Sequence, residues 1–200
     1  MTAQTTSARV DPSGDDPRYQ RLLEATRDAS QKGYEAVQMR DLAATTRMSL
    51  ATIYQFCSSK DDLIAQAHVA WIQRFRADLD RRPARGDTAA DRVIDVLSRF
   101  TASMERNHEL ARTVMRALYS PEPSVEVSRI AVSAIYGDVI DHAIGDTVVP
   151  HRAVVIETLG HVMNSIMLQW SNGGATAAEG AAALRRTTLL VLPVAGRDPA

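Results

Sequence analysis

A chain of 200 residues is long enough to bury a core of its own, as one domain of ordinary size or as two smaller ones. Its 23 basic and 24 acidic side chains give a net charge of −1, which excludes a protein that coats nucleic acid through a uniformly basic surface. The one cysteine, Cys57, excludes an intrachain disulfide and a cysteine-based zinc site, and it favours a reducing compartment.

Residues 1–15 are rich in Thr, Ser, Gly and Asp, and we expect them to form a disordered tail. They have no apolar segment of the kind that a signal peptide needs, and no apolar run in the chain reaches the length of a membrane span. We therefore expect a cytoplasmic protein with no membrane partner.

The apolar residues that follow recur with a helical period, and runs of β-branched residues are few. The first helix is expected to begin at Asp16 or Pro17, because an acidic cap precedes a residue that suits the first helical position. It runs to Lys32 and stops at Gly33, which suits a left-handed residue at a helix end.

Two short helices come next, one over 39–45 and one that runs through Phe56 after the N-cap residue Ser49. A long helix follows, with apolar residues spaced for one face. Together with the later segments these elements make an all-α fold of about nine helices. The long helix and those after it are expected over 60–81, 88–105, 107–119, 125–143, 150–172 and 176–192.

The segment 33–63, GYEAVQMRDLAATTRMSLATIYQFCSSKDDL, has the pattern of a helix-turn-helix. A recognition helix must be short enough to lie in the major groove and must offer small or polar side chains to the base edges. Ile53 and Cys57 are spaced for the buried face of that helix. The side chains left for DNA are Leu50, Ala51, Thr52, Gln55 and Phe56, with Tyr54 at the boundary.

This segment resembles the DNA-binding domain of the TetR family of bacterial transcription regulators. Three residues depart from the family pattern: Cys57 replaces a core Phe, Arg47 replaces a Gly in the turn, and Gln55 stands where Arg is frequent. A side chain at position 47 carries a conformational cost if its φ is positive. The matching residues are Gly33, Leu42–Ala43, Ser49, Thr52–Ile53–Tyr54, Ser59–Lys60, Asp61–Asp62 and Leu63.

The resemblance implies a DNA-binding domain over 16–60, a helical ligand-binding and dimerisation domain over 61–192 and a tail over 193–200. The stretches GYEAVQMRDLA, MERNHELARTVMRALYS and LQWSNGGAT further resemble the branch that contains the actinobacterial repressor of cholesterol catabolism. In that branch the effector is a steroid-derived CoA thioester.

The resemblance also implies phosphate contacts by Tyr54 and Lys60, and a contact of Arg47 with the DNA backbone. Gln38 either only caps the second helix or also contacts a phosphate, and Arg40 is either a DNA contact or a solvated helix residue. The full set expected at DNA is Gln38, Arg40, Arg47, Ser49, Leu50, Ala51, Thr52, Tyr54, Gln55, Phe56 and Lys60.

Large apolar or amphipathic side chains recur on successive helices of the larger domain, and in a helical bundle they converge. Each can belong to a packed core, or the group can line a ligand cavity, to which the family resemblance points. The group comprises Trp71, Phe75, Met104, Met115, Leu118, Tyr119, Tyr136, Ile140, Met163, Met167 and Trp170.

The helices expected over 150–172 and 176–192 are apolar on more than one face, which indicates burial on several sides. One face can pack on its own domain and another on a partner subunit, and the resemblance implies a two-fold homodimer. The residues expected at the dimer interface are Val155, Leu159, Val162, Ile166, Leu184 and Leu189.

The chain has no nucleophile elbow, P-loop, dinucleotide fingerprint or paired histidines, so we expect no enzyme, no cofactor and no metal site. The resemblance implies a homodimeric repressor that binds a near-palindromic DNA operator and is released by a small apolar effector, such as a steroid- or lipid-derived acyl-CoA. The long helix over 60–81 would transmit that signal. Two alternatives remain open: a sensor of another ligand class such as a drug, and a helical carrier or enzyme that uses the C-terminal cavity.

Overall fold

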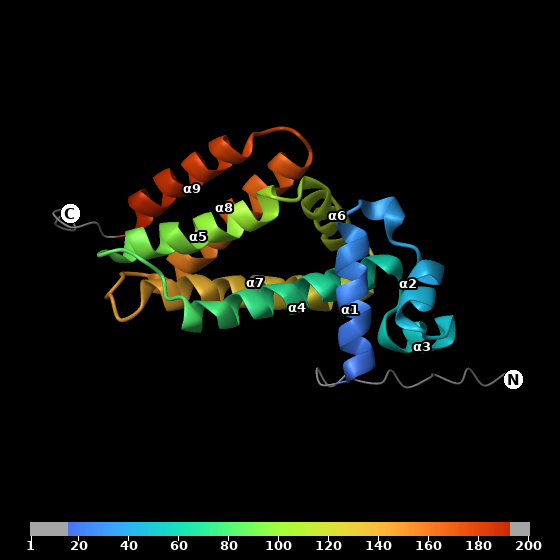
Figure 1. The fold of residues 1–200 in the computed structure, drawn as a ribbon. Coiled ribbons are helices and arrows are strands. Elements are labelled where there is room, and N and C mark those ends of the chain that lie inside the picture. The colour runs from blue at the N-terminus through green and yellow to red at the C-terminus, as the bar shows by residue number, and fades with distance from the viewer. Residues whose placement is uncertain (1–15, 193–200) are drawn as a thin grey trace, which may run out of the picture.

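The computed structural model describes residues 16–192, and the expected all-α fold of about nine helices is confirmed there (Figure 1). Both predicted tails lie outside the described residues. No helix among residues 16–192 is long and apolar enough to cross a bilayer. The elements are α1 Pro17–Ser30, the 3-10 helix η1 Tyr34–Ala36, α2 Met39–Thr46, α3 Leu50–Phe56, α4 Lys60–Arg81, α5 Ala89–Glu105, α6 His108–Leu118, α7 Pro123–Ile144, α8 Arg152–Ser171 and α9 Ala177–Val191.

Side-chain caps fix where several helices begin. Asp16 accepts a hydrogen bond from the backbone N–H of Arg18 at 2.8 Å, and Pro17 is the first residue of α1, as predicted. The predicted cap Thr176 begins α9, where the carboxylate of Glu179 in turn accepts from the Thr176 N–H. Each such cap satisfies backbone N–H groups that have no partner within the helix.

The end of α1 differs from the prediction. The helix stops at Ser30 because tighter bonds replace the α pattern, with the Lys32 N–H donating to the Ala29 carbonyl at 2.9 Å. Gly33 has φ +106° and ψ 165°, so it is not a left-handed helix terminus but the residue that leads into η1. The short helix η1 was not among the elements predicted from the sequence.

Two clusters of buried side chains hold the molecule together, and α4 contributes to both. The first cluster surrounds the short helices α2 and α3 and includes Leu22, Ile53 and Leu63. It also includes Val114 of α6, which is 3% exposed. The packing therefore continues across the domain boundary predicted after residue 60.

The second cluster lies toward the other end of α4 and contains a group of aromatic rings. The ring centroid of Phe100 is 5.4 Å from that of Trp71, 5.7 Å from that of Phe75 and 4.8 Å from that of Tyr136. Edge-to-face contacts at these distances stabilise beyond the burial of their area by about 0.5–1.5 kcal/mol each. α4, α5 and α7 are thereby fixed to one another.

Candidate nucleic-acid interface and adjoining cavity

Helix α3 presents an exposed face and is held by a buried one. Ile53 is fully buried and Cys57 is 1% exposed, as predicted. On the opposite side Tyr54 is 53% exposed, and Leu50, Ala51 and Gln55 are exposed as well. A short helix with this division can offer small and polar side chains to a groove while its position is fixed by the core.

The prediction that Phe56 faces DNA is wrong. Its side chain is 5% exposed, and its ring centroid lies 5.3 Å from that of Tyr19 in α1. Phe56 follows Ile53 by three residues, so both lie on the same face of α3. This face packs into the core.

The turn between α2 and α3 is made by a residue in a left-handed conformation. Arg47 has φ 56° and ψ 39°, and its side chain is exposed. The following N–H, that of Met48, donates to the Ala43 carbonyl at 3.0 Å. A non-glycine residue here carries the conformational cost that the sequence predicts.

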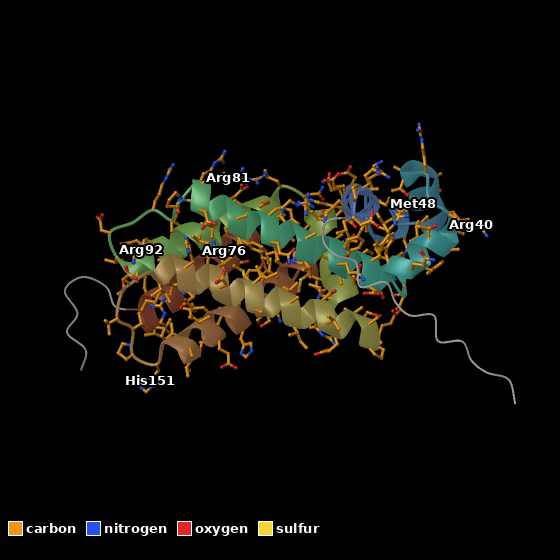
Figure 2. All side chains as sticks on the ribbon, turned by 90° about the horizontal axis from the view of Figure 1, so that it is seen from below. Arg40, Met48, Arg76, Arg81, Arg92 and His151 are labelled. Atoms are coloured by element: carbon orange, nitrogen blue, oxygen red, sulfur yellow. The ribbon has the colours of Figure 1, made fainter. Side chains whose placement is uncertain are left out.

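Ser49 is confirmed as the N-cap of α3, since its Oγ accepts from the Thr52 N–H at 3.0 Å. Gln38 occupies the N-cap position of α2, but its side chain does not cap it and instead donates to the Glu35 carbonyl at 2.8 Å. Arg40, on α2, lies at the end of the molecule opposite His151 (Figure 2).

Lys60 begins α4 and is bound to η1. Its Nζ donates to the Tyr34 carbonyl at 3.1 Å and lies 3.7 Å from the centroid of the Tyr34 ring. An ammonium group has three hydrogens, so the predicted phosphate contact is compatible with this bond. The hydroxyl of Tyr34 donates to Asp61 at 2.5 Å, and burial together with this bond raises the pKa of Tyr34 to about 12.

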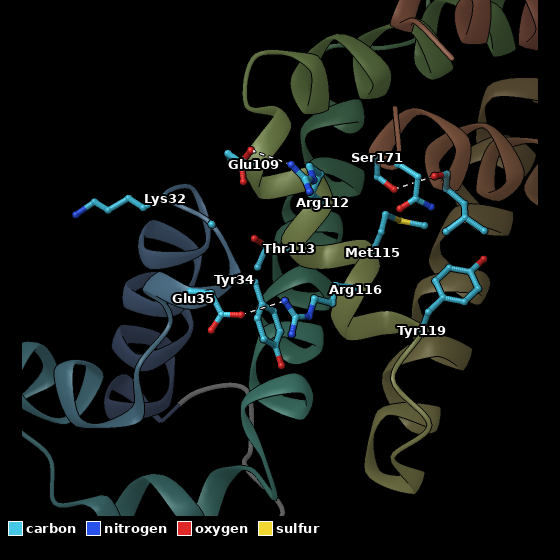
Figure 3. A pocket seen from close by; sticks show the side chains of 13 residues that line it. Lys32, Tyr34, Glu35, Glu109, Arg112, Thr113, Met115, Arg116, Tyr119 and Ser171 are labelled. Carbon is cyan, nitrogen blue, oxygen red and sulfur yellow. Dashed lines mark hydrogen bonds and ion pairs between the residues drawn. The ribbon is translucent and has the colours of Figure 1, made fainter. Parts of the chain in front are cut away.

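A cavity of about 560 Å³ lies between η1, α6 and the end of α8 (Figure 3). Two of the residues predicted to bind a ligand, Met115 and Tyr119, line it. Sequence reasoning missed most of its lining, because the cavity forms where the η1 segment meets a helix about 80 residues later. The residues it missed are Lys32, Gly33, Tyr34, Glu35, Glu109, Arg112, Thr113, Arg116, Leu168, Ser171 and Asn172.

The structure does not bring the other predicted ligand residues to this cavity. Leu118 packs in the cluster around α2 and α3. The remaining eight pack in or against the second cluster, in agreement with the packed-core interpretation. They are Trp71, Phe75, Met104, Tyr136, Ile140, Met163, Met167 and Trp170.

Three residues predicted at the dimer interface are buried within their own subunit, which corrects their assignment. Leu159 is fully buried, Leu184 is 3% exposed, and Ile166 is 9% exposed. α8 and α9 pack on each other, and these side chains fill that contact and the core beneath it.

The remaining predicted interface residues, Val155, Val162 and Leu189, are half-buried. The residues expected at the interface do not include Val154 and Leu190, which are 59% and 79% exposed. Each directly adjoins a predicted residue in the sequence, so both helices carry large exposed apolar side chains.

Two buried polar atoms without a hydrogen-bond partner in the described part of the chain were also missed. They are Nδ1 of His68 in α4 and Oγ1 of Thr113 in α6. The only sequence signal for either is a polar residue at an apolar position of an amphipathic helix. Buried polar groups are normally paired, so each exception calls for an explanation.

With this geometry established, comparison with known families defines the class of protein. Residues 22–67 match "Bacterial regulatory proteins, tetR family". Residues 86–191, more than half of the chain, match "Tetracyclin repressor-like, C-terminal domain". The chain belongs to the TetR family of bacterial transcriptional regulators, as the helix-turn-helix residues indicated.

The chain is also similar to individual proteins of this family. The HTH-type transcriptional repressor KstR of Rhodococcus jostii (strain RHA1) is 28% identical over 91% of this chain and 86% of that protein. A TetR regulator structure from Rhodococcus sp. RHA1 has a TM-score of 0.77 at 21% identity, over 88% of this chain and 95% of that one. Thermus thermophilus FadR, solved in complex with lauroyl-CoA, has a TM-score of 0.67 at 16% identity, over 91% of this chain and all of that one.

Proposed function

We propose that this protein is a cytoplasmic transcriptional repressor that binds a near-palindromic operator as a homodimer and is released by an acyl-CoA effector. The single observation that carries the DNA-binding role is the exposed face of α3, formed by Leu50, Ala51, Tyr54 and Gln55 on a helix locked by Ile53. The family membership favours this function over the carrier or enzyme that the sequence left open.

On DNA, α3 lies in the major groove. Gln55 and Thr52 hydrogen-bond base edges, while Leu50 and Ala51 contact a thymine methyl group. Arg47 in the turn and Arg40 on α2 are exposed, and neither forms an ion pair with a described residue, so both are available to phosphates. The set proposed at phosphates also includes Gln38, Ser49, Tyr54 and Lys60.

The proposed dimer uses the outer faces of α8 and α9. Val154 and Leu190 are large exposed apolar side chains on these two helices, and Val155, Val162 and Leu189 are half-buried beside them. A two-fold axis through this surface pairs identical patches. It places two copies of α3 about one helical turn of DNA apart, roughly 34 Å.

The proposed effector is a steroid- or lipid-derived acyl-CoA. Its support is the likeness to KstR and the likeness to a FadR that was solved with lauroyl-CoA. The effector must favour the state that does not bind DNA, and a coupling of about 1–3 kcal/mol would weaken operator binding about 5–150-fold. Helix α4, 22 residues long, runs from the helix-turn-helix toward the second cluster and transmits this change.

The test is fluorescence anisotropy of the full-length protein on DNA from upstream of its own gene and on shuffled DNA. We expect Gln55→Ala to reduce the preference for the upstream DNA by at least about fivefold, because each base contact contributes about 1–3 kcal/mol to discrimination and the homodimer loses one contact in each half-site. The matched control is Gln73→Ala, which removes an exposed glutamine from α4 and leaves the preference intact. Equal affinity of the wild-type protein for the two DNAs would overturn the proposal.

A further inference from the structure

The hydroxyl of Thr113 is oriented unlike those of other buried threonines in this protein. Thr26, Thr46 and Thr188 each donate to the carbonyl four residues earlier, at 2.6–2.8 Å. Thr113 is 1% exposed, lines the cavity beside η1, and has no hydrogen-bond partner among the described residues. Figure 3 shows its oxygen directed from α6 toward the segment that precedes η1. A buried hydroxyl left in this state is expected to bind a polar group that enters the cavity.

Two arginines of the same helix also line the cavity. Arg112 contacts Glu109 at 3.5 Å, and Arg116 contacts Glu35 at 3.1 Å. Both ion pairs are more than half exposed, so each is weak and can be exchanged for a better anion. The Lys32 side chain points away from the cavity (Figure 3), so the arginines supply its positive charge.

Guanidinium groups bind phosphate through paired hydrogen bonds, and a hydroxyl completes such a site as a further donor. A volume of about 560 Å³ is in the range that binds whole small molecules. It is far larger than an inorganic phosphate needs. The chemistry therefore indicates the phosphorylated part of a larger ligand.

Arg116 also joins α6 to the DNA-binding part of the chain. Arg116 lies 3.6 Å from the centroid of the Tyr34 ring while it pairs with Glu35, and Tyr34 is bonded in turn to Asp61 and Lys60 at the start of α4. An anion that takes Arg116 removes both of its contacts with η1. The cavity thus adjoins the contacts that set the position of the helix-turn-helix.

We propose that this cavity binds the phosphate groups of a small ligand through Thr113, Arg112 and Arg116, and that binding releases η1 from Arg116. A free nucleotide and the nucleotide end of a CoA thioester share this chemistry. Binding is independent of the proposed repressor function, and only the consequence for operator affinity rests on that function.

The binding test is isothermal titration calorimetry of the full-length protein without DNA, with CoA, adenosine 3′,5′-bisphosphate and inorganic phosphate as probes. We expect CoA to bind and inorganic phosphate to bind at least tenfold more weakly. Binding of the bisphosphate as tightly as CoA indicates that the nucleotide suffices, as for a free nucleotide, and CoA binding at least tenfold tighter indicates a ligand with a pantetheine arm, as in a CoA thioester. Failure of both organic probes to bind at 1 mM would overturn the proposal.

Substitutions at Thr113 and Arg112 test whether these residues form the binding site. Thr113→Val keeps the side-chain shape and is expected to weaken CoA binding about fivefold, and Arg112→Gln about tenfold. The control Arg106→Gln changes an exposed arginine outside the cavity and keeps the wild-type affinity. Equal CoA affinity in all four proteins would place the ligand elsewhere and refute the assignment.

The consequence for DNA is tested with Arg116→Gln, which lacks the contacts that the anion is proposed to displace. We expect CoA to weaken operator binding by the wild-type protein at least fivefold and by this variant less than twofold. An equal effect on both proteins would refute the coupling. Absence of operator binding by the wild-type protein would instead refute the repressor function, while the calorimetric result would stand.

Discussion

His68 shows how burial can keep a titratable side chain uncharged. It is 5% exposed in α4, and its ring centroid lies 5.6 Å from that of Trp71. Burial, with a smaller contribution from the nearby charge of Arg27, lowers the pKa of His68 to about 3. Between about pH 3 and about pH 6.5 the unfolded chain binds a proton at His68 that the folded chain does not. The free energy of unfolding therefore falls as the pH falls through this window.

His68→Phe is therefore expected to flatten the acid side of the stability profile. The free energy of unfolding of the wild-type protein should fall more steeply than that of the variant between pH 6 and 4, by about 1 kcal/mol per pH unit. Urea unfolding at pH 4, 5, 6, 7 and 8 measures this difference. Between pH 7 and 8 the two profiles should be parallel, which provides the control. Profiles parallel down to pH 4 would contradict a neutral buried His68.

Arg47 combines a conformational cost with a positive charge at the turn. Its left-handed φ of 56° suits glycine, so Arg47→Gly is expected to raise the free energy of unfolding by about 1 kcal/mol. The same change should reduce the salt dependence of operator binding by about one unit of slope for each subunit, because one phosphate contact is lost.

Arg47→Ala separates the two effects, because alanine lacks the charge but retains the strain. It should lower the salt slope as glycine does without the gain in stability. Denaturant unfolding and anisotropy at several salt concentrations measure both quantities. A salt slope unchanged in both variants would remove Arg47 from the proposed DNA contacts.

At the scale of elements, the contact between α8 and α9 depends on a glycine. A Cβ placed on Gly180 would lie 2.6 Å from Cγ2 of Ile166, whereas a Cβ on Gly160 would meet nothing within 4 Å. Gly180→Ala is therefore expected to lower the free energy of unfolding by about 1–3 kcal/mol, as overpacking does. Gly160→Ala should raise it by about 0.5–1 kcal/mol, because alanine favours helix.

Thermal unfolding followed by circular dichroism compares the two alanine variants. They should shift the midpoint in opposite directions from that of the wild-type protein. Stabilisation by both would show that α9 does not approach α8 as closely as the structure describes.

Local signals explain why the helices could be predicted from the sequence. Asp16, Ser49 and Thr176 cap their helices through backbone groups within three residues, so adjacent residues specify the start. The spacing of residues within α3 likewise predicted its exposed face. Phe56 was the exception, because its burial depends on Tyr19 in α1. The faces of α8 were misassigned because its apolar residues surround the helix and only its packing on α6, α7 and α9 selects the inner side.

Across the whole molecule, the cavity was the feature that the sequence could predict least. It requires the chain near Tyr34 to meet α6 near Arg116, and no periodicity within either segment indicates that meeting. Apart from Met115 and Tyr119, which line the cavity, the predicted large apolar side chains pack in or against the two cores, where burial stabilises them without a ligand.

The near-neutral charge of the chain also bears on how strongly one subunit is attracted to DNA. In the segment 33–60, Arg40, Arg47 and Lys60 are opposed by Glu35 and Asp41, so the attraction of one subunit to DNA is local and weak. In the proposed homodimer, two matched half-sites would supply much of the affinity. Both cores include residues of α4, so a change at either end of this helix can reach the other.

The central claim is that an acyl-CoA releases this protein from a specific operator. The most direct measurement is the dissociation constant of the full-length protein for its upstream DNA, determined by anisotropy with and without long-chain and steroid-derived CoA thioesters. The account predicts a clear preference over shuffled DNA and a rise in that constant of about 5- to 150-fold with at least one thioester. The same constant with and without every thioester, or no preference for the upstream DNA, would contradict it.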